Sequence, residues 1–210
     1  YDYKGAKGGG LEVKLTWPES DLEMMEVTIP EYIGDEKFHT YYMTVSGHME
    51  YNWGGNSMSA KNRDYVKDLA LCEEAKAYLA AQKELDLALE YLLAQLEEAG
   101  VADKTVIVLS GDHYPYGMEK SSIDELAGHE VEENFELYRS HLILYCPGME
   151  PVTVTKPCSA LDIVPTVLNL FGVKYDSRLF MGQDIFSTAA PLVMFSNKSY
   201  ITDKVMYNSK

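Results

Sequence analysis

The chain has 210 residues, with 33 acidic and 18 basic side chains and a formal net charge of −15. This length suffices for one large domain with its own core, and the acidic excess argues against nucleic acid as a partner. No apolar run is long enough to span a bilayer and the first ten residues contain no signal-peptide core, so any anchor is expected outside this chain.

The three cysteines, Cys72, Cys146 and Cys158, are widely spaced and form no C-x-x-C pair. This pattern indicates neither a disulfide framework nor a zinc ribbon. We therefore expect the three thiols to be buried as small hydrophobic groups.

The first half of the chain predicts a loop-rich start, one strand and one long helix. Residues 1–36 contain the glycine cluster GAKGGG and a short helical run around Met24. Residues 38–45, FHTYYMTV, are aromatic and β-branched, which predicts a strand that ends in Ser46-Gly47-His48. Residues 73–99 place large apolar side chains on one stripe with Gly100 behind them, which predicts an amphipathic helix.

The apolar run at residues 105–109 predicts a buried strand that ends at Gly111-Asp112-His113. Open α/β sheets bind ligands just beyond the carboxyl ends of their strands, and a carboxylate with an imidazole suits a divalent cation. An equally weighted alternative is that Asp112 only caps a turn and His113 is a polar loop residue.

The remaining elements follow in alternation. Residues 119–136 form an acidic loop region, which is a solvated face or a lid. Residues 141–146 predict a strand, and residues 159–172 predict a helix with Asp162 as its N-cap. Residues 192–207 predict an antiparallel hairpin. The alternation indicates an α/β fold with a mostly parallel sheet, helices on both of its faces and a small antiparallel C-terminal element.

The predicted site combines three side chains at strand ends. Asp112 and His113 are the expected metal ligands, and His48 is expected to donate an Nε2 hydrogen bond to an anionic oxygen held by the metal. Transfer or hydrolysis at phosphate or sulfate also needs a nucleophile. Thr44, Ser46 and Ser110 lie near the right strand ends, but each is equally explained as a strand or turn hydroxyl.

Several motifs together resemble the C-terminal part of the sulfatase-like phosphoglycerol transferases, with the lipoteichoic acid synthases as the nearest group, in the alkaline phosphatase superfamily. The resemblance extends from about Trp17 to the end of the chain. The stretches that carry it are FHTYYMTVSGH, YLAAQKELDLALEYLLAQLEEAG, VIVLSGDHYPYG, LDIVPTVLNLFG and RLFMGQDIF.

The resemblance implies metal ligation by Asp112 and His113 and substrate-phosphate binding by His48. It implies Mn²⁺ or Mg²⁺ as cofactor, with Zn²⁺ or Ca²⁺ as alternatives. The family's threonine nucleophile and a glutamate ligand are expected upstream, so no catalytic nucleophile is identified in this chain. Residues 1–36 are then a connecting segment, residues 37–190 the C-terminal part of an N-terminally incomplete catalytic domain, and residues 191–210 a hairpin packed on it.

The function implied by the resemblance is transfer of glycerol phosphate from a phosphatidylglycerol-type lipid to a polymer or sugar acceptor in cell-envelope synthesis. Other phosphate or sulfate esters remain as alternative substrates. The family works at the extracellular face of the bacterial cell membrane, anchored by helices that are absent from this chain, and the chain alone is expected to be inactive. The alternatives are a sulfatase or phosphodiesterase of the same superfamily, or a non-catalytic binding module with a vestigial site.

Overall fold

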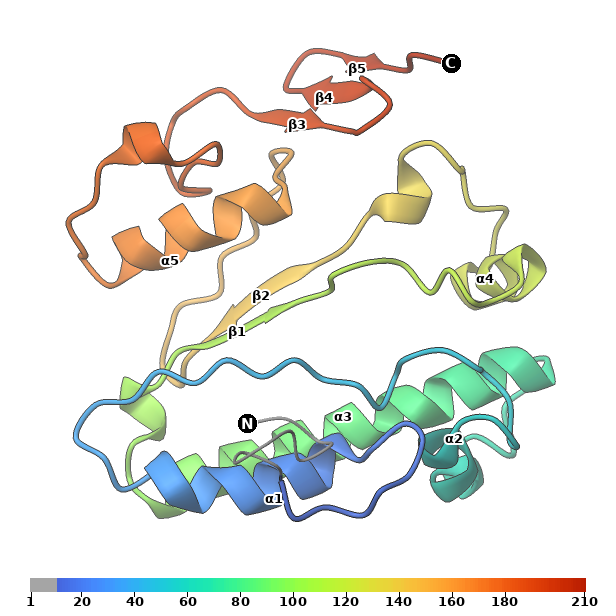
Figure 1. Ribbon diagram of the computed structural model, residues 1–210. Coiled ribbons are helices and arrows are strands. Elements are labelled where there is room, and N and C mark those ends of the chain that lie inside the picture. Colours follow the sequence, from blue (N-terminus) through green and yellow to red (C-terminus); the bar gives the residue numbers. More distant parts are fainter. Residues whose placement is uncertain (1–10) are drawn as a thin grey trace. The chain divides into compact units, whose positions relative to one another are not determined.

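The computed structural model describes residues 11–210 and has an α/β composition (Figure 1). The chain forms two compact units. The first comprises the residues up to Val106 together with His113–Leu137, and the second comprises Ile107–Asp112 together with Tyr138–Lys210. Part of the predicted connecting segment, including its glycine cluster, lies outside the described residues.

The first unit is built on one long helix, α3 (Glu73–Glu98), which confirms the predicted helix. Helices α1 (Asp21–Tyr32) and α2 (Ser57–Lys61) pack against α3, and α4 (Lys120–Ala127) also contacts it. The buried stripe of α3 is rich in alanine, which lets the neighbouring helices approach closely. Its members are Ala75, Ala77, Ala80, Ala81, Glu84, Ala88, Leu92 and Leu96.

A buried carboxylate links helices α1, α2 and α3 of this unit. The side chain of Glu84 is fully buried, and it accepts hydrogen bonds from Lys61 Nζ at 2.7 Å, from Asn62 Nδ2 at 2.9 Å and from Ser20 Oγ. Burial by itself raises the pKa of Glu84, but these hydrogen bonds more than offset it, so that its pKa lies below the usual 4.5.

Glu84→Gln is expected to lower the free energy of unfolding by about 1–3 kcal/mol at pH 7, because the variant loses the negative charge that three hydrogen-bond donors stabilise. The folded-state pKa is depressed, so this contribution is fully present above the unfolded-state pKa and disappears as the pH falls through the folded-state value. Urea unfolding at several pH values measures it. Asp86→Asn, which disrupts an exposed pair with Lys83 on the same helix, should leave the free energy of unfolding nearly unchanged.

The predicted strand at residues 38–45 is wrong, because this segment is irregular in the structure. No other strand pairs with its backbone within the described residues. Its Tyr41 and Met43 side chains are 78% and 72% exposed. An extended, β-branched segment becomes a strand only when a neighbouring strand satisfies its backbone groups, and the segment has no such neighbour.

The second unit contains two antiparallel sheets. Strand β1 (Ile107–Ser110) pairs with β2 (Leu142–Tyr145), with Ile107 opposite Tyr145. Strands β3 (Leu192–Met194), β4 (Tyr200–Thr202) and β5 (Met206–Tyr207) form a meander. The α/β class and the strands around residues 105–109 and 141–146 are therefore confirmed, and the predicted hairpin is present with a third strand.

The mostly parallel sheet is not found, since every strand pair within residues 11–210 is antiparallel. The chain leaves β1, passes through residues of the first unit and returns along β2 in the opposite direction. Strand β1 is also only partly buried, whereas a strand inside a parallel sheet is covered on both faces.

Helix α5 (Ile163–Leu170) organises the segment that follows it. It is preceded by a short 3-10 turn in which Ser159 and Asp162 form a capping box, so Asp162 acts within the turn instead of capping α5 by a side-chain bond. Asp162 Oδ1 and Thr166 Oγ1 accept the backbone N–H groups of Gln183 and Ile185 at 2.8 and 3.0 Å. These bonds fix residues 183–185 against the helix.

The expectation of buried cysteines is wrong. Cys72 and Cys158 are exposed and Cys146 is partly buried. Cys72 stands at the N-cap of α3, where its sulfur accepts the N–H of Ala75, which explains its surface position.

The remaining 3-10 turns lie at Arg63–Tyr65, Ala102–Lys104, Glu136–Tyr138 and Ser177–Leu179. Among residues 11–210, none of the helices has the length and apolar character needed to cross a membrane.

Candidate functional site

The turn that carries His48 is anchored to the start of α1. His48 N donates to Val45 O at 2.9 Å, which closes the turn. The carboxylate of Asp21 accepts the N–H groups of Val45 at 2.8 Å and Ser46 at 3.2 Å. Asp21 N in return donates to Ser46 Oγ at 2.8 Å. The turn therefore begins at a fixed point, although the segment before it forms no strand.

The chain after His48 adopts an uncommon backbone conformation. Met49 and Glu50 both have positive φ, 51° and 53°, a region that side chains other than glycine seldom occupy. Asn56, which caps the N-terminus of α2 through Oδ1, uses Nδ2 to donate to Ser46 O at 3.3 Å and Met49 O at 3.2 Å. The end of the turn is thus held by the start of α2.

His48 lies among aromatic rings of the first unit. Its ring centroid is 6.0 Å from that of Trp17 and 6.3 Å from that of His113. Its Nδ1 atom is buried and has no hydrogen-bond partner within the described residues. Buried polar atoms in native proteins are nearly always paired, so an unpaired ring nitrogen here fits a position where a ligand oxygen or water supplies the partner. The predicted hydrogen bond used Nε2, whereas the orphaned nitrogen is Nδ1.

His113 is bonded to the backbone through one ring nitrogen. Its Nδ1 lies 2.8 Å from Tyr114 O, a distance at which Nδ1–H donates to the carbonyl. A ring N–H donated to a backbone carbonyl is a bond that metal-binding histidines commonly make, because it fixes the tautomer and the ring orientation. The ring is exposed, and Tyr116 lies beside it at a centroid distance of 4.7 Å.

Asp112 follows β1 directly in the second unit and is exposed. A Cβ at the preceding Gly111 would lie 2.8 Å from Ser140 Oγ, so a larger residue there would require the Ser140 side chain to move. Asp112 and His113 are adjacent in the chain and have the donor types that a divalent cation uses. Within residues 11–210, however, no group of three or more His, Cys, Asp or Glu side chains is placed to hold a metal. The residues fit a metal site by type and supply only part of one.

The three hydroxyls considered as nucleophiles are explained by local structure or lack an activating partner. Ser46 is fully buried and its Oγ donates to Glu19 O at 3.0 Å. Ser110 Oγ donates to Gly111 O at 3.1 Å. Thr44 lies exposed in the irregular segment before the turn. None of these three hydroxyls has a general base within hydrogen-bond distance among the contacts of the described residues.

The acidic region after the motif is held by its own hydrogen bonds. His129 Nε2 lies 2.7 Å from Glu136 Oε1, and this bond raises the pKa of His129. Backbone N–H groups, first that of Asn134, lower the pKa of Glu132 to about 2. These groups are exposed and locally paired, which favours the interpretation as a solvated face.

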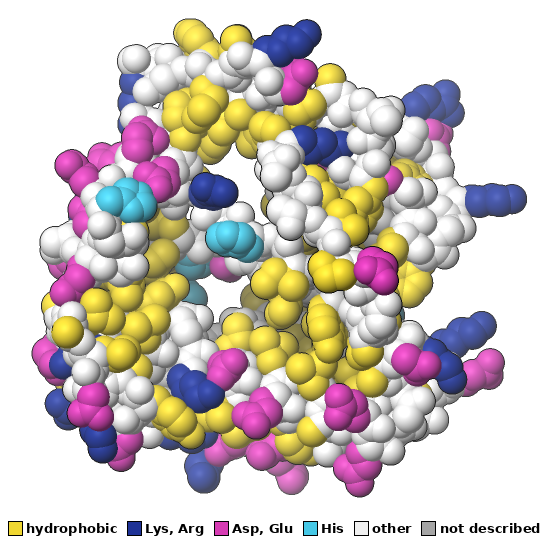
Figure 2. Space-filling view, turned by 180° about the vertical axis from the view of Figure 1, so that it is seen from behind, with side chains coloured by type: hydrophobic (Ala, Val, Ile, Leu, Met, Phe, Trp, Pro, Cys, Tyr) yellow, Lys and Arg dark blue, Asp and Glu magenta, His cyan; other side chains and the backbone are white. Residues whose placement is uncertain are grey.

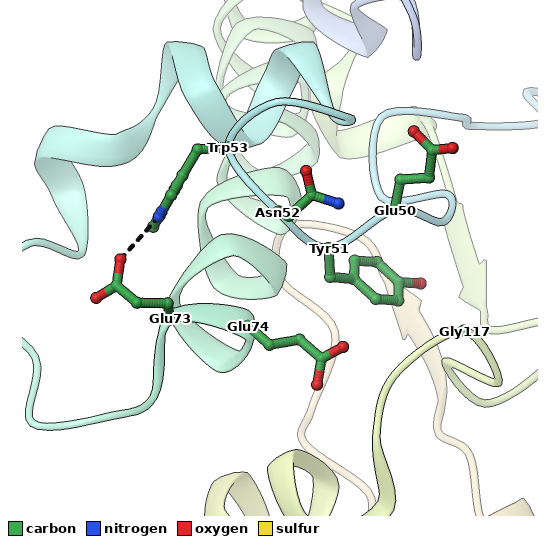
Figure 3. A pocket seen from close by; sticks show the side chains of 7 residues that line it. All are labelled: Glu50, Tyr51, Asn52, Trp53, Glu73, Glu74 and Gly117. Carbon is green, nitrogen blue, oxygen red and sulfur yellow. Dashed lines mark hydrogen bonds between the residues drawn. The ribbon is translucent and has the colours of Figure 1, made fainter.

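A shallow cavity of about 290 Å³ in the first unit was not anticipated from the sequence (Figure 3). Its lining residues are Glu50, Tyr51, Asn52, Trp53, Glu73, Glu74 and Gly117. Glu73 accepts the indole N–H of Trp53 at 2.8 Å, and Glu74 accepts the N–H of Glu119 at 3.1 Å. Glu73 and Glu74 are adjacent at the start of α3, but Glu50 and Gly117 come from distant parts of the chain, so no sequence pattern could have grouped the lining residues.

Comparison with known proteins points in one direction. The Sulfatase family model matches residues 13–173. Lipoteichoic acid synthase 2 of Bacillus subtilis is 26% identical over 206 residues, which cover 96% of this chain and 30% of that protein. The lipoteichoic acid synthase of Staphylococcus aureus strain USA300 is 25% identical over 202 residues, covering 94% and 29%.

The crystal structure of the lipoteichoic acid synthase LtaP from Listeria monocytogenes is also similar. It superposes with a TM-score of 0.70 at 25% identity, and the match covers 91% of this chain and 49% of that chain. The chain spans about a third of the length of the curated relatives that it matches.

Proposed function

The chain belongs to the sulfatase family, and we propose that it forms part of the catalytic domain of a metal-dependent phosphoglycerol transferase of the lipoteichoic acid synthase type. The proposed donor is a phosphatidylglycerol-type lipid and the proposed acceptor a growing polymer or a sugar. The similarity to two lipoteichoic acid synthases and to LtaP over more than nine-tenths of this chain supports the proposal.

One observation in the structure supports the proposal: the ring of His113 lies 6.3 Å, centroid to centroid, from the ring of His48, whose buried Nδ1 has no hydrogen-bond partner within the described residues. His113 Nε2 and the carboxylate of Asp112 would hold the divalent cation, Mn²⁺ or Mg²⁺ in preference to Zn²⁺ or Ca²⁺. When bound, the cation polarises the ester's phosphoryl oxygen and neutralises its charge. His48 binds a non-bridging oxygen of the same group and orients it, and His113 keeps its tautomer through the Tyr114 carbonyl.

We further propose that the nucleophile, a threonine, and the remaining metal ligand come from polypeptide outside this chain. The local pairing of Ser46 and Ser110 supports this assignment. Large hydrophobic side chains also remain exposed in each unit, among them Met43 in the first and Leu179 and Met181 in the second, and Figure 2 shows such side chains in yellow on one face. Such exposed apolar surface is compatible with packing against further polypeptide.

The proposed place of action is the extracellular face of the bacterial cell membrane, with anchoring helices outside this chain. In domain terms, residues 37–190 contribute to the catalytic domain and residues 191–210 pack on it. The acidic charge of −15 supports a substrate other than nucleic acid.

A hydrolytic sulfatase or phosphodiesterase is the second candidate, because the family model that matches is that of the sulfatases. Such an enzyme would use the same Asp112, His113 and His48. The nucleophile separates the two, since a modified cysteine or serine indicates sulfate ester hydrolysis and a threonine indicates transfer. An assay of the full-length protein with a labelled phosphatidylglycerol analogue and with an aryl sulfate decides between them. Turnover of neither substrate by a metal-loaded, folded protein would favour a binding module with a vestigial site.

For residues 1–210 alone, we expect only weak Mn²⁺ binding and no ester turnover. Two protein ligands leave most of the coordination sphere to water, and affinity falls steeply when part of a ligand set is missing. Isothermal titration calorimetry with Mn²⁺ measures this. Submicromolar binding that disappears in Asp112→Ala would show that this chain carries a complete metal site and would contradict the prediction.

A further inference from the structure

We propose that Asp21 and Asn56 are positioning residues for His48, each acting on one end of the turn that carries it. This inference rests on the proposed function, in which His48 binds a phosphoryl oxygen. Asp21 belongs to α1 and Asn56 stands at the N-cap of α2. Both side chains are fully buried.

Asp21 fixes the entrance to the turn. Its two carboxylate oxygens accept the N–H groups of Val45 and Ser46, at 2.8 and 3.2 Å. Ser46 Oγ, which accepts Asp21 N, also donates to Glu19 O, so that the hydroxyl joins the turn to the residues before α1. The backbone two residues before His48 therefore has a defined position in the absence of any strand pairing.

Asn56 fixes the exit from the turn. One amide serves two structures: Oδ1 accepts the N–H groups of Met58 and Ser59 and begins α2, while Nδ2 donates to Ser46 O and Met49 O. The residue bonded at the exit, Met49, has a positive φ, as does Glu50. Such a conformation persists only where the surroundings impose it, and strained backbone gathers at functional sites.

Together the two side chains hold the backbone on both sides of His48 and leave its ring free of hydrogen bonds at Nδ1. The ring is then oriented by the turn and by its neighbours Trp17 and His113. A purely structural turn would need neither the strained exit nor a buried, unpaired ring nitrogen. The geometry points to a histidine that is held ready for an external oxygen.

The test compares two asparagines at opposite ends of α2 by NMR of the five histidine rings in the 210-residue protein. Asn56 and Asn62 are both buried, but Nδ2 of Asn62 donates to Glu84 and not to the turn. Asn56→Ala is expected to move the His48 ring signals toward random-coil positions, and Asn62→Ala is expected to lower thermal stability without moving them. Equal displacement in both variants, or in neither, would overturn the inference.

Asn56→Asp separates the capping role of Oδ1 from the bonding of the turn by Nδ2. It replaces Asn56→Ala in the experiment if that variant does not fold. Aspartate caps a helix as well as asparagine does, but it has no Nδ2–H to donate. The His48 signals should therefore move although α2 remains capped. Unchanged His48 signals in a folded Asn56→Asp protein would show that the Nδ2 bonds do not position the ring.

Addition of sn-glycerol 3-phosphate with Mg²⁺, which is diamagnetic and leaves the NMR signals sharp, tests the underlying function separately. We expect the His48 signals of the wild-type protein to respond to this ligand, and the response to be lost in Asn56→Ala and kept in Asn62→Ala. If the wild-type His48 signals do not respond even at ligand and cation concentrations that exceed the weak binding expected for this chain, the proposed phosphate-binding role of His48 fails. The comparison of the ligand-free variants still decides whether Asn56 positions the ring.

Discussion

His113→Ala is expected to reduce turnover by the proposed full-length transferase on the order of 10³-fold or more, and Asp112→Ala by a similar factor. Each substitution removes one of the two proposed metal ligands of this chain, and a bound cation would contribute several kcal/mol of transition-state charge stabilisation. Initial rates with a labelled phosphatidylglycerol analogue, measured over a range of Mn²⁺ concentrations, give the effect. Partial recovery at high Mn²⁺ would identify weakened metal binding as the cause.

His129→Ala is the matched control for this prediction. His129 is also an exposed histidine of the first unit, but its ring nitrogens lie against Glu136 Oε1 and Ala127 O. Its replacement should leave turnover within about twofold, since surface substitutions away from a functional site have little effect on stability. Equal losses in His113→Ala and His129→Ala would assign the effect to the fold of this region and remove His113 from the metal site.

The elements that were predicted correctly are those that local sequence determines. Helix α3 follows from a regular apolar spacing with Gly100 at its end, where φ is +67°. Strands β1 and β2 follow from short apolar runs that end in Gly or Pro. Both patterns concern residues close together in the chain, so they need no knowledge of the neighbouring elements.

The errors concern properties that depend on a distant partner. Residues 38–45 have the composition of a strand, yet nothing in that composition reveals whether a second strand lies beside them. The direction of β2 relative to β1 is likewise set by the path of the chain between them. A polar residue such as Asp21 or Asn56 looks in the sequence like a surface residue, and only the structure shows that each is buried and bonded to the His48 turn.

The sequence indicated the residue types of the candidate site, but it did not indicate the buried side chains that hold the His48 turn in place. Asp112 and His113 stand where a strand ends, and this position could be predicted from the run that precedes them. The ring centroids of His48 and His113 lie 6.3 Å apart in the first unit, although the two residues are 65 positions apart in the chain. The resemblance to the family implied both residues, whereas the orphaned Nδ1 of His48 emerged only from the structure.

His48→Ala is expected to lower kcat of the proposed full-length enzyme by about 10²–10³-fold, with a smaller effect on thermal stability. The loss corresponds to roughly 2.7–4 kcal/mol, which is typical when one donor to a developing anionic oxygen is removed from a water-excluded site. The cost to the fold should be small, because neither the Asp21 bonds nor the Asn56 bonds to the turn involve the His48 side chain.

Measuring kcat and melting temperature on the same His48→Ala protein separates binding of substrate from support of the turn. His39→Ala provides the matched control, since His39 is an exposed histidine nine residues earlier in the same irregular segment and should change neither quantity. Normal turnover with a depressed melting temperature would make His48 a structural residue, because a ring that only fills space beside Trp17 and His113 stabilises the turn without touching the substrate. Reduced turnover with an unchanged melting temperature requires the ring to act on the reacting group.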